Sequence, residues 1–233
     1  MRTEQPHRPL MSEERLEQIQ DLRRTLLEGA GGAPAGEETV SFHHLTLKVP
    51  AEVMTPCPVS PKFGSAIVAE LRDGDRVLDM GTGSGSLGIL AAGKASRVLA
   101  VDLNPYAVGT ARANAALNGV ADRVEVRRSD IFSAVDGTFD MIIFNPPFQW
   151  FPARDVADTA GQDENYAALR RFFAEVRQYL TDDGRVMLFF STMGDVDFVL
   201  GLIAEAGFRR EDVLRATNDV AGTEVEFFVY CLR

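Results

Sequence analysis

The stretch that decides the fold is residues 139–151, FDMIIFNPPFQWF. Its first six residues are apolar apart from one aspartate, and they favour a β-strand that ends at Asn145. Because residues 141–144 are continuously apolar, both faces of the strand are expected to be covered, as in a parallel sheet. Two prolines, which cannot donate a backbone hydrogen bond, and three aromatic residues follow. The stretch therefore predicts a buried strand that delivers one amide side chain to the edge of a sheet.

The rest of the chain alternates strand and helix patterns around this stretch. Strands are predicted at 76–80, 97–101, 123–128, 139–144 and 185–190, and helices at 85–92, 105–118, 163–180 and 195–206. Two further strands, 208–216 and 224–231, have a short connection and are expected to pair antiparallel. The pattern predicts an α/β fold, a doubly wound and mostly parallel seven-stranded sheet with an antiparallel final strand.

Residues 1–50 are expected to form an extension of a domain that spans 51–233. Residues 11–28 have a helical apolar stripe with Ser12 as N-cap, and residues 29–36, GAGGAPAG, predict a flexible linker. Residues 39–49 predict a hairpin or an edge strand. We expect the helix to act as a lid, and the alternative is a helix that docks on the core or on a second subunit.

The composition is that of a soluble globular protein, with 233 residues, 45% hydrophobic and 25% charged. The sequence contains no run of about 18 apolar residues, so no membrane span is expected. The N-terminus has no apolar core of the kind that a signal peptide has. Cys57 and Cys231 are expected to be free thiols in a reducing cytoplasm, with a disulfide between them as the alternative. The net charge of −10 argues against a nucleic-acid partner.

A glycine-rich turn lies at residues 77–92, VLDMGTGSGSLGILAA. Gly81 and Gly83 follow Asp79 between a strand and a helix, where glycines let a ligand approach the backbone. Asp102 ends the next strand, where an acidic residue accepts hydrogen bonds from ribose hydroxyls. Together these features indicate a nucleoside ligand. The spacing from Gly83 to Gly88 also fits Gly-x-Gly-x-x-Gly, so nicotinamide binding is an alternative.

Four motifs in order, DMGTGSGSLGI, AVDLNPYAVGTARANAALNGV, RRSDIF and FDMIIFNPPF, resemble the class I S-adenosylmethionine-dependent methyltransferases. They are most similar to the branch with an Asn-Pro-Pro-Tyr/Phe motif, which includes release-factor glutamine methyltransferases and several rRNA and tRNA base-amine methyltransferases. The resemblance extends over roughly residues 50–231. It implies a Rossmann-like fold and S-adenosyl-L-methionine as cofactor, with no metal.

The resemblance also implies roles for individual residues. Asp79, Gly81 and Gly83 would face the amino-acid part of the cofactor, and Asp102 the ribose, with Leu103 and Asn104 beside it. Asp130 would meet the adenine amino group, Ile131 would pack on the ring, and Pro58 and Ser60 would touch the carboxylate end. Asn145, Pro146, Pro147 and Phe148 would form the acceptor site next to the cofactor.

Asn145 and Pro146 suit the activation of a planar nitrogen. The Asn145 side-chain oxygen and the Pro146 carbonyl are two acceptors that can hold both N–H protons of an amine and turn its lone pair toward a methyl group. Phe148 can stack on a planar acceptor. The alternative for residues 145–151 is a rigid turn whose aromatic residues only pack in the core. Tyr166 and Ser191 are weaker candidates for substrate contact, with core packing and capping expected instead.

These features predict methyl transfer to an amide-like or planar amino nitrogen. The short N-terminal extension and the acidic charge favour a small-molecule or carrier-bound acceptor over a protein acceptor, which stays an alternative. The same residues are also compatible with cyclisation of the cofactor to azetidine-2-carboxylate and methylthioadenosine, with methylation of an rRNA or tRNA base amine, and with a binding scaffold without turnover. His43 and His44 are adjacent, so on a strand they would point to opposite faces and could not both ligate one metal.

Overall fold

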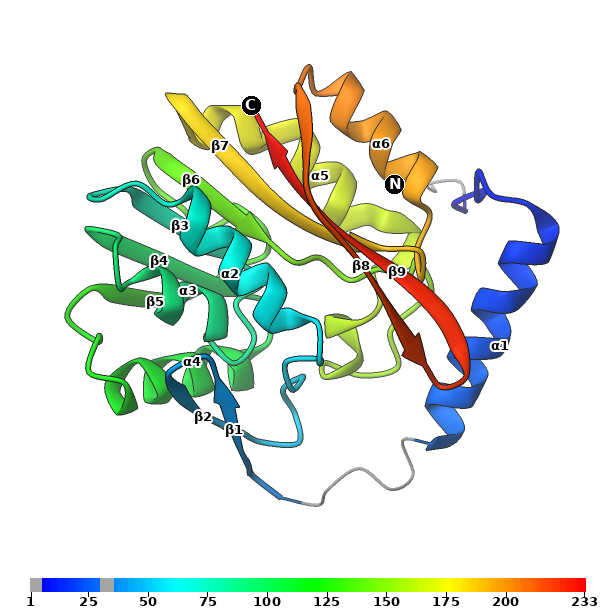
Figure 1. Ribbon diagram of the computed structural model, residues 1–233, viewed down its shortest axis with the longest axis horizontal. Coiled ribbons are helices and arrows are strands. Elements are labelled where there is room, and N and C mark those ends of the chain that lie inside the picture. Colours follow the sequence, from blue (N-terminus) through cyan, green and yellow to red (C-terminus); the bar gives the residue numbers. More distant parts are fainter. Residues whose placement is uncertain (1–5, 30–35) are drawn as a thin grey trace.

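The computed structural model describes residues 6–29 and 36–233, and a seven-stranded sheet lies at its centre (Figure 1). The strand order is β5-β4-β3-β6-β7-β9-β8. The strands are β3 (Arg76–Met80), β4 (Arg97–Asp102), β5 (Val124–Arg128), β6 (Phe139–Phe144), β7 (Leu180–Ser191), β8 (Arg210–Val220) and β9 (Thr223–Leu232). The first five pair in parallel, whereas β9 runs antiparallel to both of its neighbours. The predicted fold class is confirmed.

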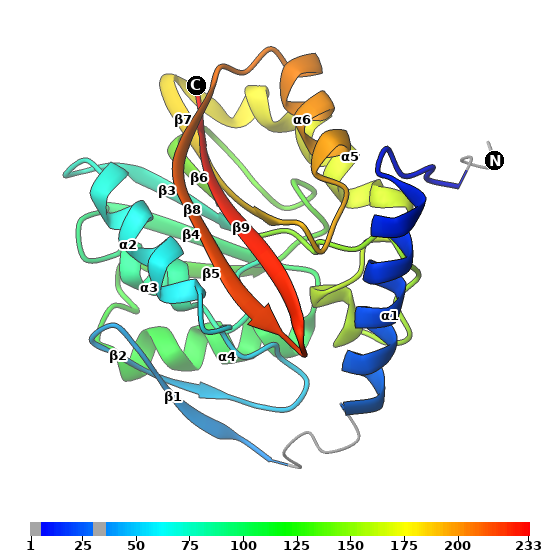
Figure 2. The same cartoon turned by 45° about the vertical axis from the view of Figure 1, so that its right-hand side comes forward.

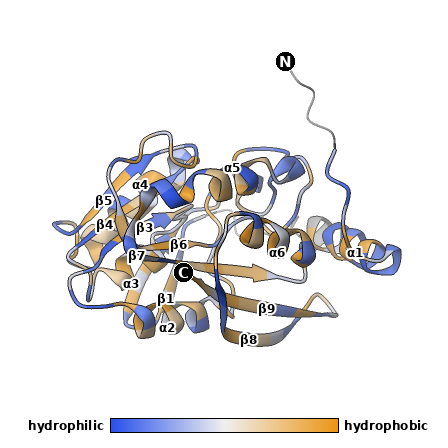
Figure 3. Ribbon diagram, turned by 90° about the horizontal axis from the view of Figure 1, so that it is seen from above, coloured by the Kyte–Doolittle hydropathy of each residue, from blue (hydrophilic) through white to orange (hydrophobic). Residues whose placement is uncertain are grey.

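Helices cover both faces of the sheet and make two separate cores. Val77 and Met141 point into the core beneath α2, α3 and α4, whereas the next residues, Leu78 and Ile142, point into the core beneath α5 and α6. The helices are α2 (Ser60–Glu70), α3 (Ser86–Ala91), α4 (Pro105–Leu117), α5 (Ala167–Glu175) and α6 (Val196–Glu205). Figure 3 shows hydrophobic residues along the central strands and hydrophilic residues on the outer surface of α4. Burial on both faces is the reason that the strand sequences are continuously apolar.

The helix predicted at 163–180 is wrong in its extent. A 3₁₀ turn (Glu164–Tyr166) precedes α5, a second one (Val176–Tyr179) follows it, and β7 already begins at Leu180. Asn165 and Tyr166 have φ angles of 57° and 54°, which interrupts the helix at its start. At the other end Leu180 pairs with Phe139 of β6, so residues 181–184, TDDG, belong to a longer β7 with an irregular register.

The hairpin expected at 39–49 is present and forms its own two-stranded sheet, β1 (Glu38–Phe42) and β2 (Leu45–Val49). It is fixed to α4 by side-chain amides that pair with its backbone. Asn114 accepts from the Lys48 N–H at 2.9 Å and donates to the Lys48 carbonyl at 3.0 Å. Asn118 makes the same pair of contacts with Thr46. The hairpin is therefore bound through its backbone to one helix of the main domain.

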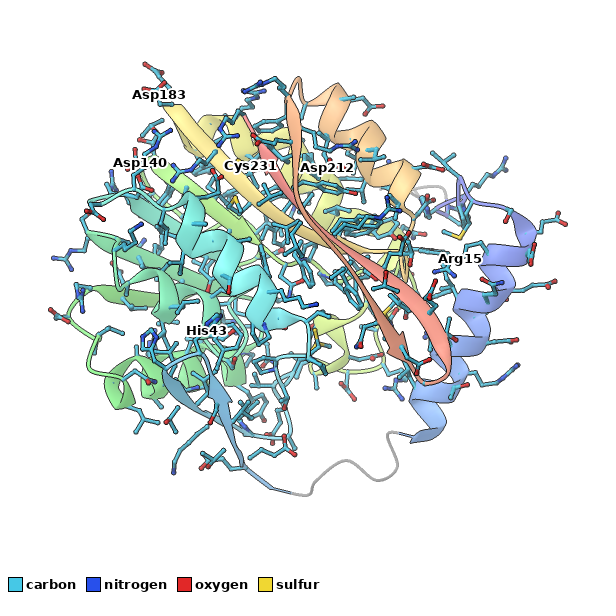
Figure 4. The ribbon with its side chains drawn as sticks, viewed as in Figure 1. Arg15, His43, Asp140, Asp183, Asp212 and Cys231 are labelled. Carbon is cyan, nitrogen blue, oxygen red and sulfur yellow. The ribbon has the colours of Figure 1, made fainter. Side chains whose placement is uncertain are left out.

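The N-terminal helix, α1 (Glu13–Gly29), docks beside the carboxyl ends of the parallel strands (Figures 1 and 2). Its side chains Ile19 and Leu22 are almost fully buried. Arg15, labelled in Figure 4, reaches toward the domain, and its Nη2 donates to the Thr192 carbonyl at 2.6 Å. Most of the predicted linker, residues 30–35, lies outside the described residues. The lid role of this segment stays a prediction.

Cys57 and Cys231 are free thiols. Among the helices of residues 6–29 and 36–233, none combines the length and the apolar character that crossing a bilayer requires.

Candidate active site

The carboxyl ends of the parallel strands bring the predicted site residues to one edge of the sheet. Met80 pairs with Val101 on one side and with Phe144 on the other, so the ends of β3, β4 and β6 lie at one level. The strand order reverses between β3 and β6, which is where open α/β sheets bind ligands. Along this edge follow Asp130 after β5, Asp102 at the end of β4, the glycine loop after β3, and Asn145 after β6.

The glycine loop after β3 is open at Gly83. Gly81 and Gly83 have φ angles of 68° and 54°, and a Cβ built on Gly83 would meet no atom within 4 Å. The buried Asp79 carboxylate fixes the loop, because its Oδ2 accepts from the Thr82 hydroxyl at 2.6 Å and from the Gly88 N–H at 3.0 Å. Burial raises the pKa of Asp79 to about 6. The contact of Thr82 was not predicted, although its position three residues after Asp79 in a tight turn is a signal for it.

Asp102 connects the glycine loop to the beginning of α4. One carboxylate oxygen accepts from the Gly83 N–H at 2.8 Å and the other from the Asn104 N–H at 2.9 Å. Burial raises the pKa of Asp102. Asn104 caps α4 by accepting from the Tyr106 N–H, and its Nδ2 donates to the Glu52 carbonyl. Its side chain therefore binds the backbone at the start of α4 and at Glu52. Leu103 instead is 44% exposed beside Asp102.

Asp130 and Ile131 follow β5 on a strained turn. Ile131 has a φ of 50°, a conformation that β-branched residues rarely adopt, and the Ser129 hydroxyl donates to its carbonyl at 2.7 Å. The Asp130 carboxylate accepts from Arg171 of α5 at 2.9 Å and stays half-exposed. The role of Arg171 was not predicted, because 41 residues separate it from Asp130 and no local pattern connects them.

Asn145 follows β6 with an unsatisfied side-chain oxygen. Its Oδ1 is buried and has no hydrogen-bond partner among the described residues. Phe148 is only half-buried, and its ring lies edge-on to Phe189 at 5.8 Å and to Phe190 at 5.5 Å. Trp150, in contrast, is 7% exposed and belongs to the core. Packing therefore accounts for Trp150, whereas it leaves Asn145 Oδ1 without a partner.

Ser60 starts α2 and is buried, and its helix connects through Phe189 to the acceptor motif, residues 145–148. Its hydroxyl lies 3.1 Å from the Cys57 thiol, and Phe63, one turn later, stacks on Phe189 at 4.8 Å. Phe189 also contacts Phe148, so α2 and the acceptor motif pack on the same ring of β7. The contact of Pro58 and Ser60 with the cofactor stays a prediction.

Comparison with known proteins defines the class of this protein. Residues 63–206 match the methyltransferase small domain family. Over 179 residues the chain is 31% identical to a Methanocaldococcus jannaschii protein named as a putative protein N5-glutamine methyltransferase, with 74% of this chain and 89% of that protein covered. It is 32% identical over 183 residues to the release factor glutamine methyltransferase of Cereibacter sphaeroides, with 72% of this chain and 64% of that protein covered.

The solved structure of ribosomal protein L11 methylase from Lactobacillus delbrueckii subsp. bulgaricus has a TM-score of 0.60 at 19% identity, over 83% of this chain and 97% of that one, which shows the shared fold. The fold is that of S-adenosylmethionine-dependent methyltransferases. This chain belongs to the methyltransferase small domain family and is such an enzyme. The nicotinamide and scaffold alternatives are therefore wrong.

The residues present fit S-adenosylmethionine. The space above Gly83 accepts a ligand close to the backbone, the Asp102 carboxylate lies beside it, and the unpartnered Asn145 Oδ1 follows on the next strand. In the described part of the chain, no group of three His, Cys, Asp or Glu side chains is placed to hold a metal ion.

Proposed function

We propose that this methyltransferase modifies the amide nitrogen of a carboxamide, of the kind that a glutamine side chain carries. The buried and unpartnered Asn145 Oδ1 is the observation that carries the proposal. A buried hydrogen-bond acceptor that lacks a donor costs about 1–3 kcal/mol of stability. An N–H group of the bound carboxamide would remove that cost. The nitrogen of a primary amide supplies one N–H to Asn145 and a second to the Pro146 carbonyl.

The two acceptors explain how a poor nucleophile is activated. The lone pair of an amide nitrogen is delocalised into the carbonyl, so the nitrogen must be held and turned before it reacts. S-adenosylmethionine, when bound, would supply the methyl group from its positively charged sulfur and leave as S-adenosylhomocysteine, and the methylated nitrogen would release one N–H proton. Asn145 and Pro146 would accept hydrogen bonds from both N–H groups of the amide. The half-buried Phe148 ring would restrict the orientation of the amide plane. The two hydrogen-bond acceptors carry no formal charge, so the nitrogen that receives the methyl group need not belong to a strongly basic amine.

The names of two relatives support a glutamine-type amide, because one is named as an N5-glutamine methyltransferase and the other as a release factor glutamine methyltransferase. They shift the expectation from a small molecule toward a carboxamide displayed by a protein. The net charge of −10 continues to disfavour RNA. Neither of these relatives is named as a cyclase, and no contact of the described residues favours cyclisation of the cofactor.

The test incubates the pure protein with S-adenosylmethionine alone, with a glutamine-containing peptide, and with a purified peptide-chain release factor. Products and acceptors are followed by mass spectrometry. We expect S-adenosylhomocysteine and a singly methylated glutamine only when the peptide or the release factor is present. Methylthioadenosine without any acceptor would instead support cyclisation. Methylation of an added RNA but of neither amide substrate would replace the proposal with a base-amine acceptor.

A further inference from the structure

Tyr166 connects the acceptor motif to the loop after β7. Its side chain is fully buried, and its hydroxyl donates to the Phe148 carbonyl at 2.6 Å. The same hydroxyl accepts from the Asp195 N–H at 2.8 Å. Burial raises the pKa of Tyr166, so the phenol keeps its proton and acts as a hydrogen-bond donor rather than as a base. One oxygen atom thus ties the last residue of the acceptor motif to the N-cap of α6.

The backbone at Tyr166 is in a strained conformation. Asn165 and Tyr166 are both left-handed, and Tyr166 is a bulky residue that rarely adopts such a φ. Three hydrogen bonds hold the corner, from Asn165 N–H to the Trp150 carbonyl, from Tyr166 N–H to the Asp163 carbonyl, and from His7 N–H to Asn165 Oδ1. A strained corner that is held from several sides is typical of functional sites.

Gly194 shows how closely the chain is packed around the same carbonyl. A Cβ at position 194 would lie 2.1 Å from the Phe148 oxygen and 2.9 Å from the Tyr166 hydroxyl. Only glycine can occupy this position without moving Phe148. The Phe148 carbonyl is therefore enclosed by the hydroxyl of Tyr166 on one segment and by the backbone of Gly194 on another.

We infer that Tyr166 is a positioning residue, whose hydroxyl orients the acceptor motif through the Phe148 carbonyl so that Asn145 Oδ1 and the Phe148 ring meet the acceptor nitrogen. The inference rests on the proposed function, because it assumes that residues 145–148 hold the acceptor. The motif lacks an N–H anchor at this point, since proline residues 146 and 147 have no N–H to donate. A shift of the motif by about 1 Å would be enough to lower turnover about a hundredfold.

The test is Tyr166→Phe, which removes one oxygen and keeps the ring. Tyr179→Phe is the matched control, because Tyr179 stacks on Phe132 at 4.2 Å and lies outside the acceptor motif. Val199→Ala, on the buried face of α6, controls for lost stability alone. For Tyr166→Phe we expect an S-adenosylmethionine Kd within about twofold of the wild type and a kcat on the glutamine peptide or release factor at least about tenfold lower. Both controls are expected to keep their kcat.

A double substitution separates positioning from a general structural role. If Tyr166 acts through the acceptor motif, Tyr166→Phe should lower kcat much less in Asn145→Ala than in the wild type. Losses that multiply would overturn the inference. If Asn145→Ala keeps full turnover, the proposed function fails, whereas a loss in Asn145→Ala with a fully active Tyr166→Phe overturns only the inference.

A second measurement needs no acceptor. The side-chain NH₂ resonances of Asn145 should shift or broaden in Tyr166→Phe and stay unchanged in Tyr179→Phe. Unchanged Asn145 resonances in Tyr166→Phe would overturn the inference even if no acceptor is methylated in the assay.

Discussion

The Gly83 N–H donates to Asp102 Oδ2 at 2.8 Å, so the glycine loop after β3 and the acidic end of β4 form one unit. The carboxylate that is proposed to bind the ribose thereby also fixes the loop that is proposed to approach the cofactor. Such pre-organisation reduces the cost of ordering the site when a ligand binds.

Substitution of Asp102 tests this unit. In Asp102→Asn the charge is lost, and an amide group replaces one acceptor of the Gly83 or Asn104 N–H. Hydrogen bonds to charged groups contribute about 1.5–3 kcal/mol, so we expect S-adenosylmethionine to bind roughly 10- to 100-fold more weakly by calorimetry. The control is Asp122→Asn, whose side chain is 77% exposed, and it should bind normally. An unchanged Kd for Asp102→Asn would contradict the ribose assignment.

Asp79 should make cofactor binding depend on pH. Burial raises its pKa to about 6, so the carboxyl is charged above pH 6 and neutral below it. If it faces the cationic amino group of the cofactor, affinity is constant above pH 6 and falls as the pH drops below 6. Calorimetry from about pH 8 to pH 5 measures this. In Asp79→Asn binding should be weak throughout, and any remaining slope would then be assigned to Asp102, whose pKa is also raised. A flat wild-type profile would refute the assignment.

Asn145→Ala should separate binding from turnover. It removes the unpartnered Oδ1 and leaves the glycine loop intact. Loss of one pre-organised hydrogen-bonding group typically lowers kcat about 100- to 1,000-fold, and we expect that loss with an unchanged S-adenosylmethionine Kd. Asn118→Ala serves as the control, since its side chain contacts Thr46 of the hairpin. Wild-type turnover in Asn145→Ala would sink the proposed role.

Asn114→Ala should destabilise the protein more than any exposed asparagine does. The buried amide makes three hydrogen bonds, two to Lys48 and one to the Ser84 carbonyl at 2.8 Å. With about 1 kcal/mol for each bond and a cost for the groups left unpaired, the free energy of unfolding should fall by about 2–4 kcal/mol. Urea unfolding measures this, with Asn118→Ala as the milder comparison. A loss below that of Asn118→Ala would show that the hairpin is held in another way.

The N-terminal segment should undock in mild acid. His7 Nε2 lies 3.0 Å from Asp195 Oδ2, and burial lowers the pKa of His7 below its ordinary 6.5. The docked state then binds fewer protons than the undocked state, so docking is fully stable above pH 6.5 and weakens as the pH falls below it. Hydrogen exchange of the Leu10 N–H, which donates to Asp195 at 2.7 Å, reports on docking.

The protection factor of Leu10 should therefore drop between about pH 7.5 and pH 5. His7→Gln should remove this dependence, whereas His44→Gln, in the turn of the hairpin, should keep it. If Leu10 stays equally protected at both pH values, the segment is a fixed part of the domain and the lid prediction loses its support.

The helix at 163–180 shows where prediction from the sequence ends. Its apolar residues recur at helical spacing, and most of them do lie in the core beneath α5. The two left-handed residues at its start and the early beginning of β7 depend on contacts with Trp150 and Phe139, which are distant in the sequence. Local periodicity contains no information about such partners.

By itself the sequence determined the order of strands and helices, the two-faced sheet, the glycine loop with Asp102, and the acceptor motif that begins at Asn145. These features depend on periodicity and on short motifs, in which each residue acts through near neighbours. Only the tertiary structure decided that Asn145 Oδ1 is buried without a partner among the described residues, that Arg171 reaches Asp130, and that the Tyr166 hydroxyl meets the Phe148 carbonyl. The Tyr166 and Arg171 contacts join residues that are 18 and 41 positions apart in the sequence. The burial of Asn145 Oδ1 depends on several segments that surround it. Such segments come together only when the whole chain folds.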